Sequence, residues 1–353
     1  MNNYWKESEL EYLDSCPLCN QPERHKLYEG IYDRYYGCPG EWTLYHCEKC
    51  GSAYLSPRPT RDAIGKVYET YSTHSINEIK ASSLKGLKRF AVSLRNGYLN
   101  RKFGYKELPA LFFGYYAMYL LPPPLRWEWD YYARNLPVAM PNRNKLLDVG
   151  CGNGDFLVRA KHAGWEVYGL DFDAKALNLT SNRGINAFCG TLENANLAEE
   201  SFDVITMSHV IEHLHDPLNL LKQCYRLLKP EGTIWIATPN ISSFLHSRYG
   251  SNWVHLAIPS HLILFNKTSL FHLLNEAGFI KTKQLRRGFS SPYARKFSEN
   301  LKFDNTCQDH SNVGLYRKMT GLLHELIWIF HPEADEELVM VAYKKIVSSP
   351  DLQ

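Results

Sequence analysis

The sequence predicts an α/β fold, with a mostly parallel, seven-stranded sheet that carries helices on both faces. Three observations lead to this prediction and to the domain boundaries. From residue 145 onward, short β-branched runs alternate with helical periods, which is typical of a parallel sheet wrapped by helices. Two Cys-x-x-Cys pairs lie near the N-terminus, and a basic, aromatic stretch follows them. We therefore predict a small cysteine-containing module over 1–60, a helical connector over 61–140 and the α/β domain over 141–353.

Composition and charge exclude several classes of protein. With 353 residues, 44% of them hydrophobic, the chain can bury a substantial core. A formal net charge of +3 is too small to indicate a general polyanion binder. The polar stretch "NNYWKESELEY" after Met1 lacks the apolar segment of a signal peptide, so we expect a cytoplasmic location. In that reducing compartment the cysteines are better read as metal ligands than as a disulfide framework.

The N-terminal cysteines have the spacing of a zinc ribbon. "CPLC" supplies Cys16 and Cys19, and "CEKC" supplies Cys47 and Cys50 after a gap of 27 residues. Each pair can sit on a tight turn with both thiolates aimed at one point, and Gly51 suits the second turn. The alternative is four unrelated buried thiols, but so short a segment has little else to fold around. We predict a structural Zn²⁺, because four protein ligands leave no open position.

The connector is strongly basic at its start. Residues 80–106 carry eight Lys and Arg and no acid. Steps of three and four predict an amphipathic helix with its apolar face at Leu84, Leu87, Ala91, Leu94 and Tyr98. The apolar run that follows, over 108–121, is too short to span a membrane. Three interpretations of residues 80–130 stay open: helices packed against the α/β domain, peripheral contact with an anionic bilayer, and contact with RNA.

Seven strands and four helices are expected in the α/β domain. The strands are predicted over 145–149, 165–171, 185–190, 202–209, 233–239, 279–285 and 337–343. The helices are predicted over 155–163, 173–181, 217–228 and 268–277. Asp216 is expected to cap the third helix, with Pro217 at its first position, and Gly278 is expected to close the fourth.

The stretch "LLDVGCGNGDFL" joins the first strand to the first helix, where ligands of such sheets bind. Its glycines, Gly150, Gly152 and Gly154, read GxGxG and let a ligand touch the backbone. Asp155 follows at once, and its charge would repel a pyrophosphate at this helix N-terminus. Asp171 ends the second strand, where it can accept hydrogen bonds from both hydroxyls of a ribose. The pattern predicts a nucleoside ligand without a phosphate.

These motifs, together with "FDVITMSHVIEHLHDP", resemble those of class I S-adenosylmethionine-dependent methyltransferases over residues 145 to about 280. The resemblance implies a Rossmann-like fold and S-adenosylmethionine as the cofactor. It implies that Asp148 and the glycine loop hold the methionine end, that Asp171 binds the ribose, and that Phe172 covers one face of the adenine. It further implies adenine contacts from Thr191 and Leu192, and places Ser208 and His209 beside the sulfonium.

Methyl transfer from a sulfonium needs little more than alignment of the acceptor, exclusion of water and removal of one proton. Histidines suit the proton transfer, and His209 and His213 lie at the end of the fourth strand. His261 lies in a segment around 240–267 that is expected to cover the acceptor. We predict that His213 or His261 is the general base.

Two other roles for these residues stay open. Ubiquinone-type and small-RNA 2′-O-methyltransferases carry an ExxEH motif here, which forms a divalent-metal site with a downstream histidine. This sequence reads HxxEH, from His209 through Glu212 to His213, with His261 as the further ligand. Because His209 replaces the first carboxylate, a hard Mg²⁺ would lose an oxygen ligand, so a catalytic metal is the less favoured alternative. In the third interpretation, Glu212 and His213 are a structural pair that caps the next helix.

The nature of the acceptor is suggested by a second resemblance. "YHCEKCGSAYLSPRPTRDAIGKVYETYS" and "NWVHLAIPSHLILFNKTSLFHLLNEAGF" are similar to segments of bacterial methyltransferases of surface-polysaccharide and modified-sugar pathways, which commonly begin with a zinc ribbon. The extra C-terminal domain of sugar C-methyltransferases is not found in this sequence. The resemblance therefore implies O- or N-methylation of a sugar carried by a nucleotide, a lipid or a glycan.

Two further functions remain as alternatives. An RNA methyltransferase is the first, because one class of ribosomal-RNA guanine methyltransferases also opens with a "CPLC" turn. In that class the second half of the zinc site follows much more closely and includes a histidine, unlike the distant "CEKC" of this sequence. The second is a non-catalytic adaptor with a vestigial cofactor fold. Asp148, Gly150, Gly152 and Asp171 are all intact, which argues against such decay.

Overall fold

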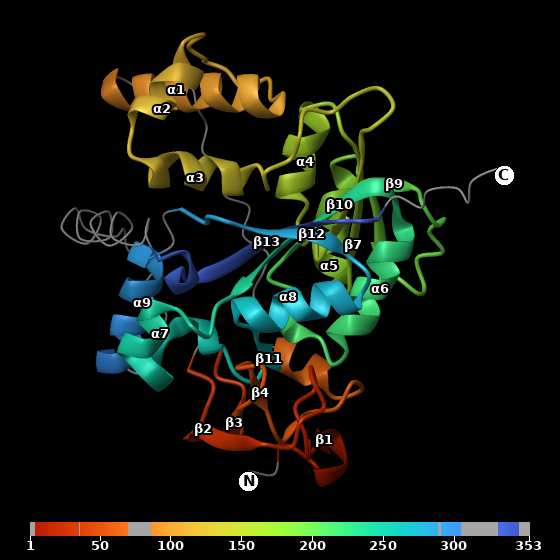
Figure 1. The fold of residues 1–353 in the computed structure, drawn as a ribbon, viewed down its shortest axis with the longest axis vertical. Coiled ribbons are helices and arrows are strands. Elements are labelled where there is room, and N and C mark those ends of the chain that lie inside the picture. Colours follow the sequence, from red (N-terminus) through yellow and green to blue (C-terminus); the bar gives the residue numbers. More distant parts are fainter. Residues whose placement is uncertain (1–3, 35, 70–85, 289–290, 305–330, 346–353) are drawn as a thin grey trace, which may run out of the picture.

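A seven-stranded sheet forms the centre of the computed structural model, which describes residues 4–34, 36–69, 86–288, 291–304 and 331–345 (Figure 1). Its strand order is β12-β13-β10-β9-β6-β7-β8. The five strands β8, β7, β6, β9 and β10 are parallel to one another. Strand β13 is antiparallel to both of its neighbours, β10 and β12. All seven predicted strands are confirmed, as β6 (Lys145–Val149), β7 (Glu166–Asp171), β8 (Asn186–Cys189), β9 (Phe202–Ser208), β10 (Leu228–Pro239), β12 (Ile280–Leu285) and β13 (Glu337–Tyr343).

Helices cover both faces of this sheet, as predicted. Alternate residues of one strand point to opposite faces, so Leu146 of β6 joins one buried cluster and Leu147 joins the other. The four predicted helices are confirmed as α4 (Asp155–His162), α5 (Ala174–Asn182), α6 (Pro217–Leu227) and α8 (Lys267–Glu276). Asp216 caps α6 by accepting a 3.0 Å hydrogen bond from the Asn219 amide, as its sequence position predicts.

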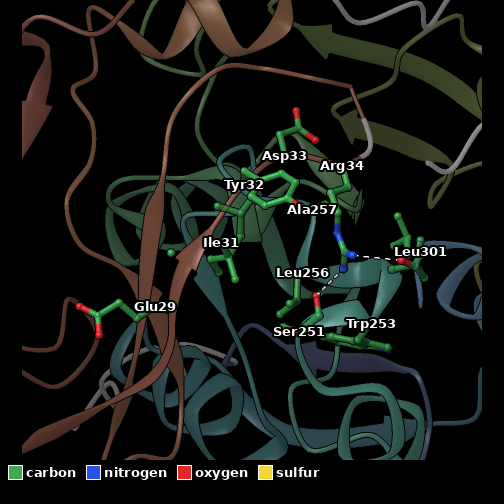
Figure 2. A pocket seen from close by; sticks show the side chains of 13 residues that line it. Glu29, Ile31, Tyr32, Asp33, Arg34, Ser251, Trp253, Leu256, Ala257 and Leu301 are labelled. Atoms are coloured by element: carbon green, nitrogen blue, oxygen red, sulfur yellow. Dashed lines mark hydrogen bonds between the residues drawn. The ribbon is translucent and has the colours of Figure 1, made fainter. Parts of the chain in front are cut away.

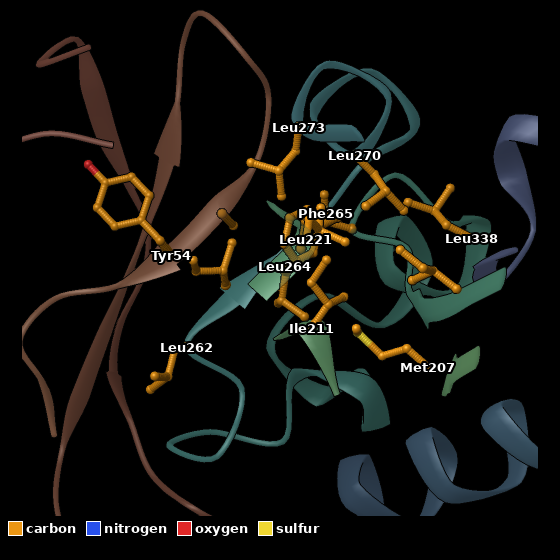
Figure 3. Close-up of a cluster of buried hydrophobic side chains, with 14 of the residues drawn as sticks. Tyr54, Met207, Ile211, Leu221, Leu262, Leu264, Phe265, Leu270, Leu273 and Leu338 are labelled. Atoms are coloured by element: carbon orange, nitrogen blue, oxygen red, sulfur yellow. The ribbon is translucent and has the colours of Figure 1, made fainter. Parts of the chain in front are cut away.

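The N-terminal module forms a second sheet, and a distant segment completes it. Its strands are β2 (Arg24–Ile31), β3 (Trp42–Cys47) and β4 (Ala53–Leu55), while β1 (Leu10–Glu11) pairs with β5 (Arg58–Pro59). The fourth strand, β11 (Ile263–Leu264), belongs to the segment expected to cover the acceptor, and Ile263 pairs with Tyr54 of β4. Figure 3 shows Tyr54, Leu264 and Met207 in one buried cluster, so the module and the α/β domain share a core.

The connector forms three helices, α1 (Gly86–Phe103), α2 (Gly114–Leu120) and α3 (Pro123–Tyr132). In Figure 1, α1 and α2 lie at the end of the molecule opposite to the N-terminal strands. The two helices cross closely at Gly97 of α1 and Gly114 of α2, since a Cβ atom on Gly114 would lie 2.3 Å from the Leu94 carbonyl oxygen and 3.1 Å from the Gly97 Cα atom. Among the described residues, no helix has both the length and the apolarity to cross a bilayer.

The apolar face predicted for α1 is largely wrong. Leu87 is 87% exposed and Ala91 is exposed, Leu94 is half-buried, and only Tyr98 is fully buried; Leu84 lies outside the described residues. The face that packs instead consists of Ser93, Asn96, Gly97, Tyr98, Leu99 and Phe103. The physical reason is the close crossing with α2, which selects small and hydrogen-bonding residues over leucine.

The remaining elements surround the carboxyl ends of the sheet. They are the helices α7 (Phe244–Tyr249) and α9 (Ser291–Asp304) and short 3₁₀ turns at Glu7–Glu9, Ile64–Tyr68, Ile211–His213, Gly250–Asn252, Val254–Leu256 and Pro332–Ala334. From β6 the chain continues to β7 and β8 on one side of β6. It then crosses back to β9 on the other side of β6. A doubly wound sheet binds its ligand at such a reversal, beyond the strand ends.

Candidate active site

The glycine loop after β6 is shaped by packing at two positions and by open space at the third. Gly150 and Gly154 have φ angles of +74° and +77°, and a Cβ atom on Gly150 would lie 2.2 Å from Val210 Cγ2. A Cβ atom on Gly154 would lie 2.8 Å from Thr180 Cγ2. A Cβ atom on Gly152, in contrast, would meet no atom within 4 Å. The loop therefore leaves room for a ligand to approach the backbone at Gly152.

Asp148 lies fully buried on β6, below this loop. Its Oδ1 atom accepts a 2.8 Å hydrogen bond from Thr206 Oγ1 and a further one from Arg134. Its Oδ2 atom is buried and has no hydrogen-bond partner among the described residues. Burial raises the pKa of Asp148, and the Arg134 guanidinium opposes that rise. Sequence reasoning missed Arg134, because it follows α3 in the part assigned to the connector.

Asp171 ties the end of β7 to the glycine loop. Its Oδ2 atom accepts a 2.8 Å hydrogen bond from the Gly152 amide, and its Oδ1 atom accepts one of 2.9 Å from the Asp173 amide. The next residue, Phe172, is 65% exposed, and its ring lies 5.2 Å from that of Tyr68. Tyr68, which comes from the N-terminal part of the chain, was also missed, and its hydroxyl lies 3.1 Å from His213 Nδ1.

All the residues that the resemblance assigned to the cofactor lie at or just after the carboxyl ends of four adjacent strands, in the order β9, β6, β7 and β8. The set comprises Asp148, Gly150, Gly152, Gly154, Asp171, Phe172, Thr191, Leu192, Ser208 and His209. The open face at Gly152, the unpartnered Asp148 oxygen and the acid at the end of β7 fit a nucleoside with a charged amino-acid tail. These residues therefore fit S-adenosylmethionine.

His213 and His261 lie together, and each is held in one tautomer. His213 Nδ1 lies 2.8 Å from the Ser260 carbonyl oxygen, and His261 Nδ1 lies 2.8 Å from that of His255. Since a carbonyl only accepts, each Nδ1–H donates and each Nε2 keeps a lone pair. The ring centroids are 4.7 Å apart. Burial lowers the pKa of His213, and it lowers that of His261 to about 3, so both rings are neutral proton acceptors.

Glu212 is fully buried beside this pair. Thr238 Oγ1 donates a 2.9 Å hydrogen bond to its Oε2 atom, whereas its Oε1 atom makes no well-formed hydrogen bond among the described residues. Burial opposes the charge of Glu212, but the neighbouring His209 outweighs it and lowers the Glu212 pKa to about 2. The interpretation of Glu212 and His213 as a cap of the next helix is wrong, because Asp216 caps α6.

His209 lies between two carboxylates at the end of β9. Its Nδ1 atom is 3.3 Å from Glu212 Oε1, and its Nε2 atom is 3.3 Å from Glu337 Oε2. Burial lowers the pKa of this histidine, but the two carboxylates more than compensate and raise it well above the ordinary value. His209 also has a φ of +53°, which is uncommon for a residue other than glycine. The two carboxylates hold the His209 ring from both of its nitrogens and favour its protonated form.

The same residues can hold a divalent metal. One ligand atom each from Glu212, His213 and His261 lie within 4.8 Å of one another. Histidines that bind metals commonly donate their other N–H to a carbonyl, as both of these do. The buried Oε1 atom of Glu212, which makes no well-formed hydrogen bond among the described residues, would supply the anionic ligand. Glu212, His213 and His261 therefore fit a divalent cation, although the HxxEH motif lacks the first carboxylate of ExxEH.

The four predicted zinc ligands meet in the N-terminal module. The Sγ atoms of Cys16 and Cys50 lie 3.7 Å apart and those of Cys19 and Cys47 lie 3.5 Å apart. All four lie within 4.8 Å of one another. A tetrahedral site with Zn–S bonds of about 2.3 Å has sulfurs roughly 3.8 Å apart, so the cluster is compatible with Zn²⁺. Gly51 has the positive φ that its turn requires.

A groove lies next to these clusters, between the end of β2 and residues 251–258 (Figure 2). It holds about 800 Å³ of empty space that opens to solvent, and apolar side chains such as Leu256 and Ile258 form part of its wall. Arg34 crosses it to donate hydrogen bonds of 3.1 Å and 3.0 Å to the carbonyls of Ser251 and Leu301. None of the predicted site residues lines this groove.

Comparison with known families decides what kind of domain these residues form. Residues 125–284 match the family model described as a methyltransferase domain. They form an S-adenosylmethionine-dependent methyltransferase domain. The match begins within α3 and so includes most of this connector helix.

Two of the curated relatives each match less than half of the chain. A protein of Albidiferax ferrireducens named ubiquinone biosynthesis O-methyltransferase is 32% identical over 146 residues, which are 38% of this chain and 56% of that protein. One of the same name from Acinetobacter baylyi is 28% identical over 189 residues, which are 49% of this chain and 77% of that protein. The chain thus spans a little over half the length of the Albidiferax relative.

Solved structures match the methyltransferase domain more distantly. One is described as an S-adenosylmethionine-dependent methyltransferase from Thermotoga maritima, a possible histamine N-methyltransferase. It is 22% identical with a TM-score of 0.42, and the match covers 66% of this chain and 97% of that one. A methyltransferase of Archaeoglobus fulgidus is 21% identical with a TM-score of 0.43, covering 66% and 99%.

Proposed function

We propose that this protein transfers a methyl group from S-adenosylmethionine to a hydroxyl of a sugar. The observation that carries the proposal is the pair of neutral histidines, each with a free Nε2 atom, beside the strand end where the sulfonium is expected. The hydroxyl oxygen forms its bond to the methyl carbon as the carbon–sulfur bond breaks. His213 or His261 takes the hydroxyl proton, and S-adenosylhomocysteine leaves.

Two considerations favour a sugar hydroxyl over other acceptors. The curated relatives are named O-methyltransferases, which supports transfer to oxygen rather than nitrogen. They are named for ubiquinone biosynthesis and not for sugar methylation. The wall next to His209 instead contains Tyr131, Arg287 and Glu337 in a hydrogen-bonded array. Such a wall of donors and acceptors suits a polyhydroxylated acceptor.

The acceptor assay uses S-adenosylmethionine labelled in its methyl group. Nucleotide sugars, lipid-linked glycans, a ubiquinone-precursor phenol and structured RNA are each incubated with the protein and analysed by mass spectrometry. We expect one methyl mass on a sugar. Label on the phenol or on an RNA nucleoside would refute the sugar acceptor and leave methyl transfer intact. Absence of cofactor binding would support the adaptor alternative.

A metal-assisted variant of this reaction is the second candidate, because Glu212, His213 and His261 fit a divalent cation. When bound, the cation would polarise the acceptor hydroxyl and lower its pKa. Glu212 would then supply the anionic ligand, and the carbonyls of Ser260 and His255 would keep the two rings oriented. We retain the general base as the primary proposal, and chelation distinguishes the two.

The zinc proposal gives a separate prediction. We expect one Zn²⁺ per chain, and replacing Cys16 and Cys47 together by serine should remove it and lower the melting temperature. Metal binding at such a site contributes directly to folding. Elemental analysis and thermal unfolding measure both effects, with Cys224→Ser, a buried thiol in α6, as the matched control. Zinc retained at one equivalent in the double variant would contradict the assignment.

We also propose that the connector rests on an anionic bilayer surface. Residues 86–127 contain seven Lys and Arg and one acid, Glu107. The α1–α2 surface, defined as the exposed large apolar side chains of this segment, comprises Leu87, Phe90, Leu108, Phe112, Phe113, Tyr116, Tyr119, Leu120 and Leu121. Phe112 and Leu120 are each 88% exposed. Exposed aromatic and apolar side chains among unopposed cations are the composition of interfacial membrane anchors.

Vesicle sedimentation tests this surface. We expect the protein to sediment with vesicles containing phosphatidylglycerol and much less with neutral phosphatidylcholine vesicles. Reversing the charge of Lys88 and Arg89 to glutamate should weaken binding about tenfold or more, at roughly 1 kcal/mol per cation. Lys222→Glu, an exposed position on α6, should have no effect. Retention by structured RNA and not by anionic vesicles would favour the RNA alternative.

A further inference from the structure

Three consecutive buried acids, Asp335, Glu336 and Glu337, lead into β13, which begins at Glu337. Arg286 pairs with Asp335 through contacts of 2.8 and 3.0 Å. Glu336 accepts a 2.9 Å hydrogen bond from the indole of Trp253. These two acids therefore fix local structure, whereas Glu337 points to the active site.

Glu337 brings three polar groups together. Tyr131 donates a 2.8 Å hydrogen bond to its Oε2 atom, and Arg287 Nε donates one of 3.0 Å to its Oε1 atom. The same Oε2 atom lies 3.3 Å from His209 Nε2. Arg287 in turn donates a 2.8 Å hydrogen bond to Glu128. Groups from α3, from the end of β12 and from β13 thus converge on the end of β9.

His209 needs such support because its backbone is in an unfavourable conformation. A non-glycine residue at φ +53° persists only where its surroundings impose it. Its amide donates a 2.9 Å hydrogen bond to the Ala237 carbonyl, which fixes the backbone. The side chain is fixed by Glu212 on one nitrogen and by Glu337 on the other. Removing Glu337 would leave the ring held on one side.

We propose that Glu337 is a positioning residue of the acceptor site, which holds His209 and, with Tyr131 and Arg287, sets the wall that receives the acceptor. This inference rests on the proposed function, since it concerns the same site. Glu337 contacts Tyr131, Arg287 and His209 and, among the described residues, makes no hydrogen bond or ion pair with Asp171 or the glycine loop. Its loss should therefore affect the acceptor more strongly than the binding of S-adenosylmethionine. Misplacing an active-site group by about 1 Å can cost about 100-fold in rate.

The test compares Glu337→Gln with Glu337→Asp and with Asp335→Asn as the control. In Glu337→Gln we expect kcat/KM for the acceptor to fall by up to about 100-fold. The affinity for S-adenosylhomocysteine, measured by calorimetry, should change much less, because Asp171 and the glycine loop are untouched. Glu337→Asp, which keeps the charge, should recover part of that loss. Asp335→Asn removes a buried acid two residues away and should lower the melting temperature without changing the ratio of kcat to KM.

A second readout does not depend on activity. In ¹⁵N-histidine-labelled protein, the resonance assigned through His209→Gln should show a slowly exchanging imidazole N–H, because both nitrogens face carboxylates. Glu337→Gln should abolish it and Asp335→Asn should keep it. A folded Glu337→Gln protein with this signal and normal acceptor kinetics would overturn the inference. A wild-type protein that keeps the signal but transfers no methyl group would refute only the proposed function.

Discussion

Asp171→Ala is expected to lower the affinity for S-adenosylmethionine and S-adenosylhomocysteine by about 100-fold or more. The substitution removes a carboxylate that would accept hydrogen bonds from two ribose hydroxyls, each contributing about 1.5 kcal/mol or more to the binding free energy. The variant would also lose the hydrogen bonds that the amides of Gly152 and Asp173 donate to this carboxylate and that hold the loop in place. Isothermal calorimetry measures the change directly.

The matched control for this variant is Glu199→Ala, which removes an exposed carboxylate that pairs only at the surface with Arg226. We expect cofactor affinity in Glu199→Ala to equal that of the wild type. If Asp171→Ala bound the cofactor as tightly as the wild type, the ribose role of this acid would be wrong. If the wild type bound neither S-adenosylmethionine nor S-adenosylhomocysteine, the assignment of the cofactor would be wrong.

His213→Ala or His261→Ala is expected to lower kcat by about 10²- to 10⁴-fold, the usual cost of losing a proton-transfer group. At least one of the two should show this loss while cofactor affinity stays unchanged. The wild type should keep its activity in the presence of a chelator, because the general base needs no metal. Turnover with labelled S-adenosylmethionine measures each effect, and His272→Ala, at an exposed position on α8, is the control.

Chelation separates the two candidate mechanisms. Activity that is abolished by a chelator and restored by Mg²⁺ or Mn²⁺ would reverse the preference for a general base and support the Glu212, His213 and His261 metal site. Restoration by Zn²⁺ alone would instead trace the loss to the cysteine cluster. Full activity in both histidine variants would exclude either role for this pair.

The seven strands and the helix caps could be predicted because their signals are local. A β-branched run such as 202–208 favours a strand over its own residues. A capping pair such as Asp216 and Pro217 determines where the helix that follows it begins. The same holds for the glycine loop and Asp171, whose places follow from the order of strand, turn and helix. The face of α1 was mispredicted because its partner is α2, and the close contact at Gly97 replaced the leucine pattern.

Glu337 and Tyr131 could not be predicted as site residues, because nothing local connects them to His209. Glu337 is 128 positions away from that histidine in the sequence. It reaches the site only because β13 inserts antiparallel between β10 and β12, which the order of segments along the chain does not reveal. The role of β11 was missed for the same reason, since two residues that extend a distant sheet carry no distinctive pattern.

The pairing of β11 with β4 makes the N-terminal module inseparable from the rest of the chain. Removing residues 1–60 would expose Leu264 and the buried side chains around it to solvent. It would also leave β11 without β4, the strand with which it pairs. His261 lies two residues before that strand, so the damage would reach the proton-transfer pair directly. Swapping this module for that of another methyltransferase would therefore disturb the acceptor site itself.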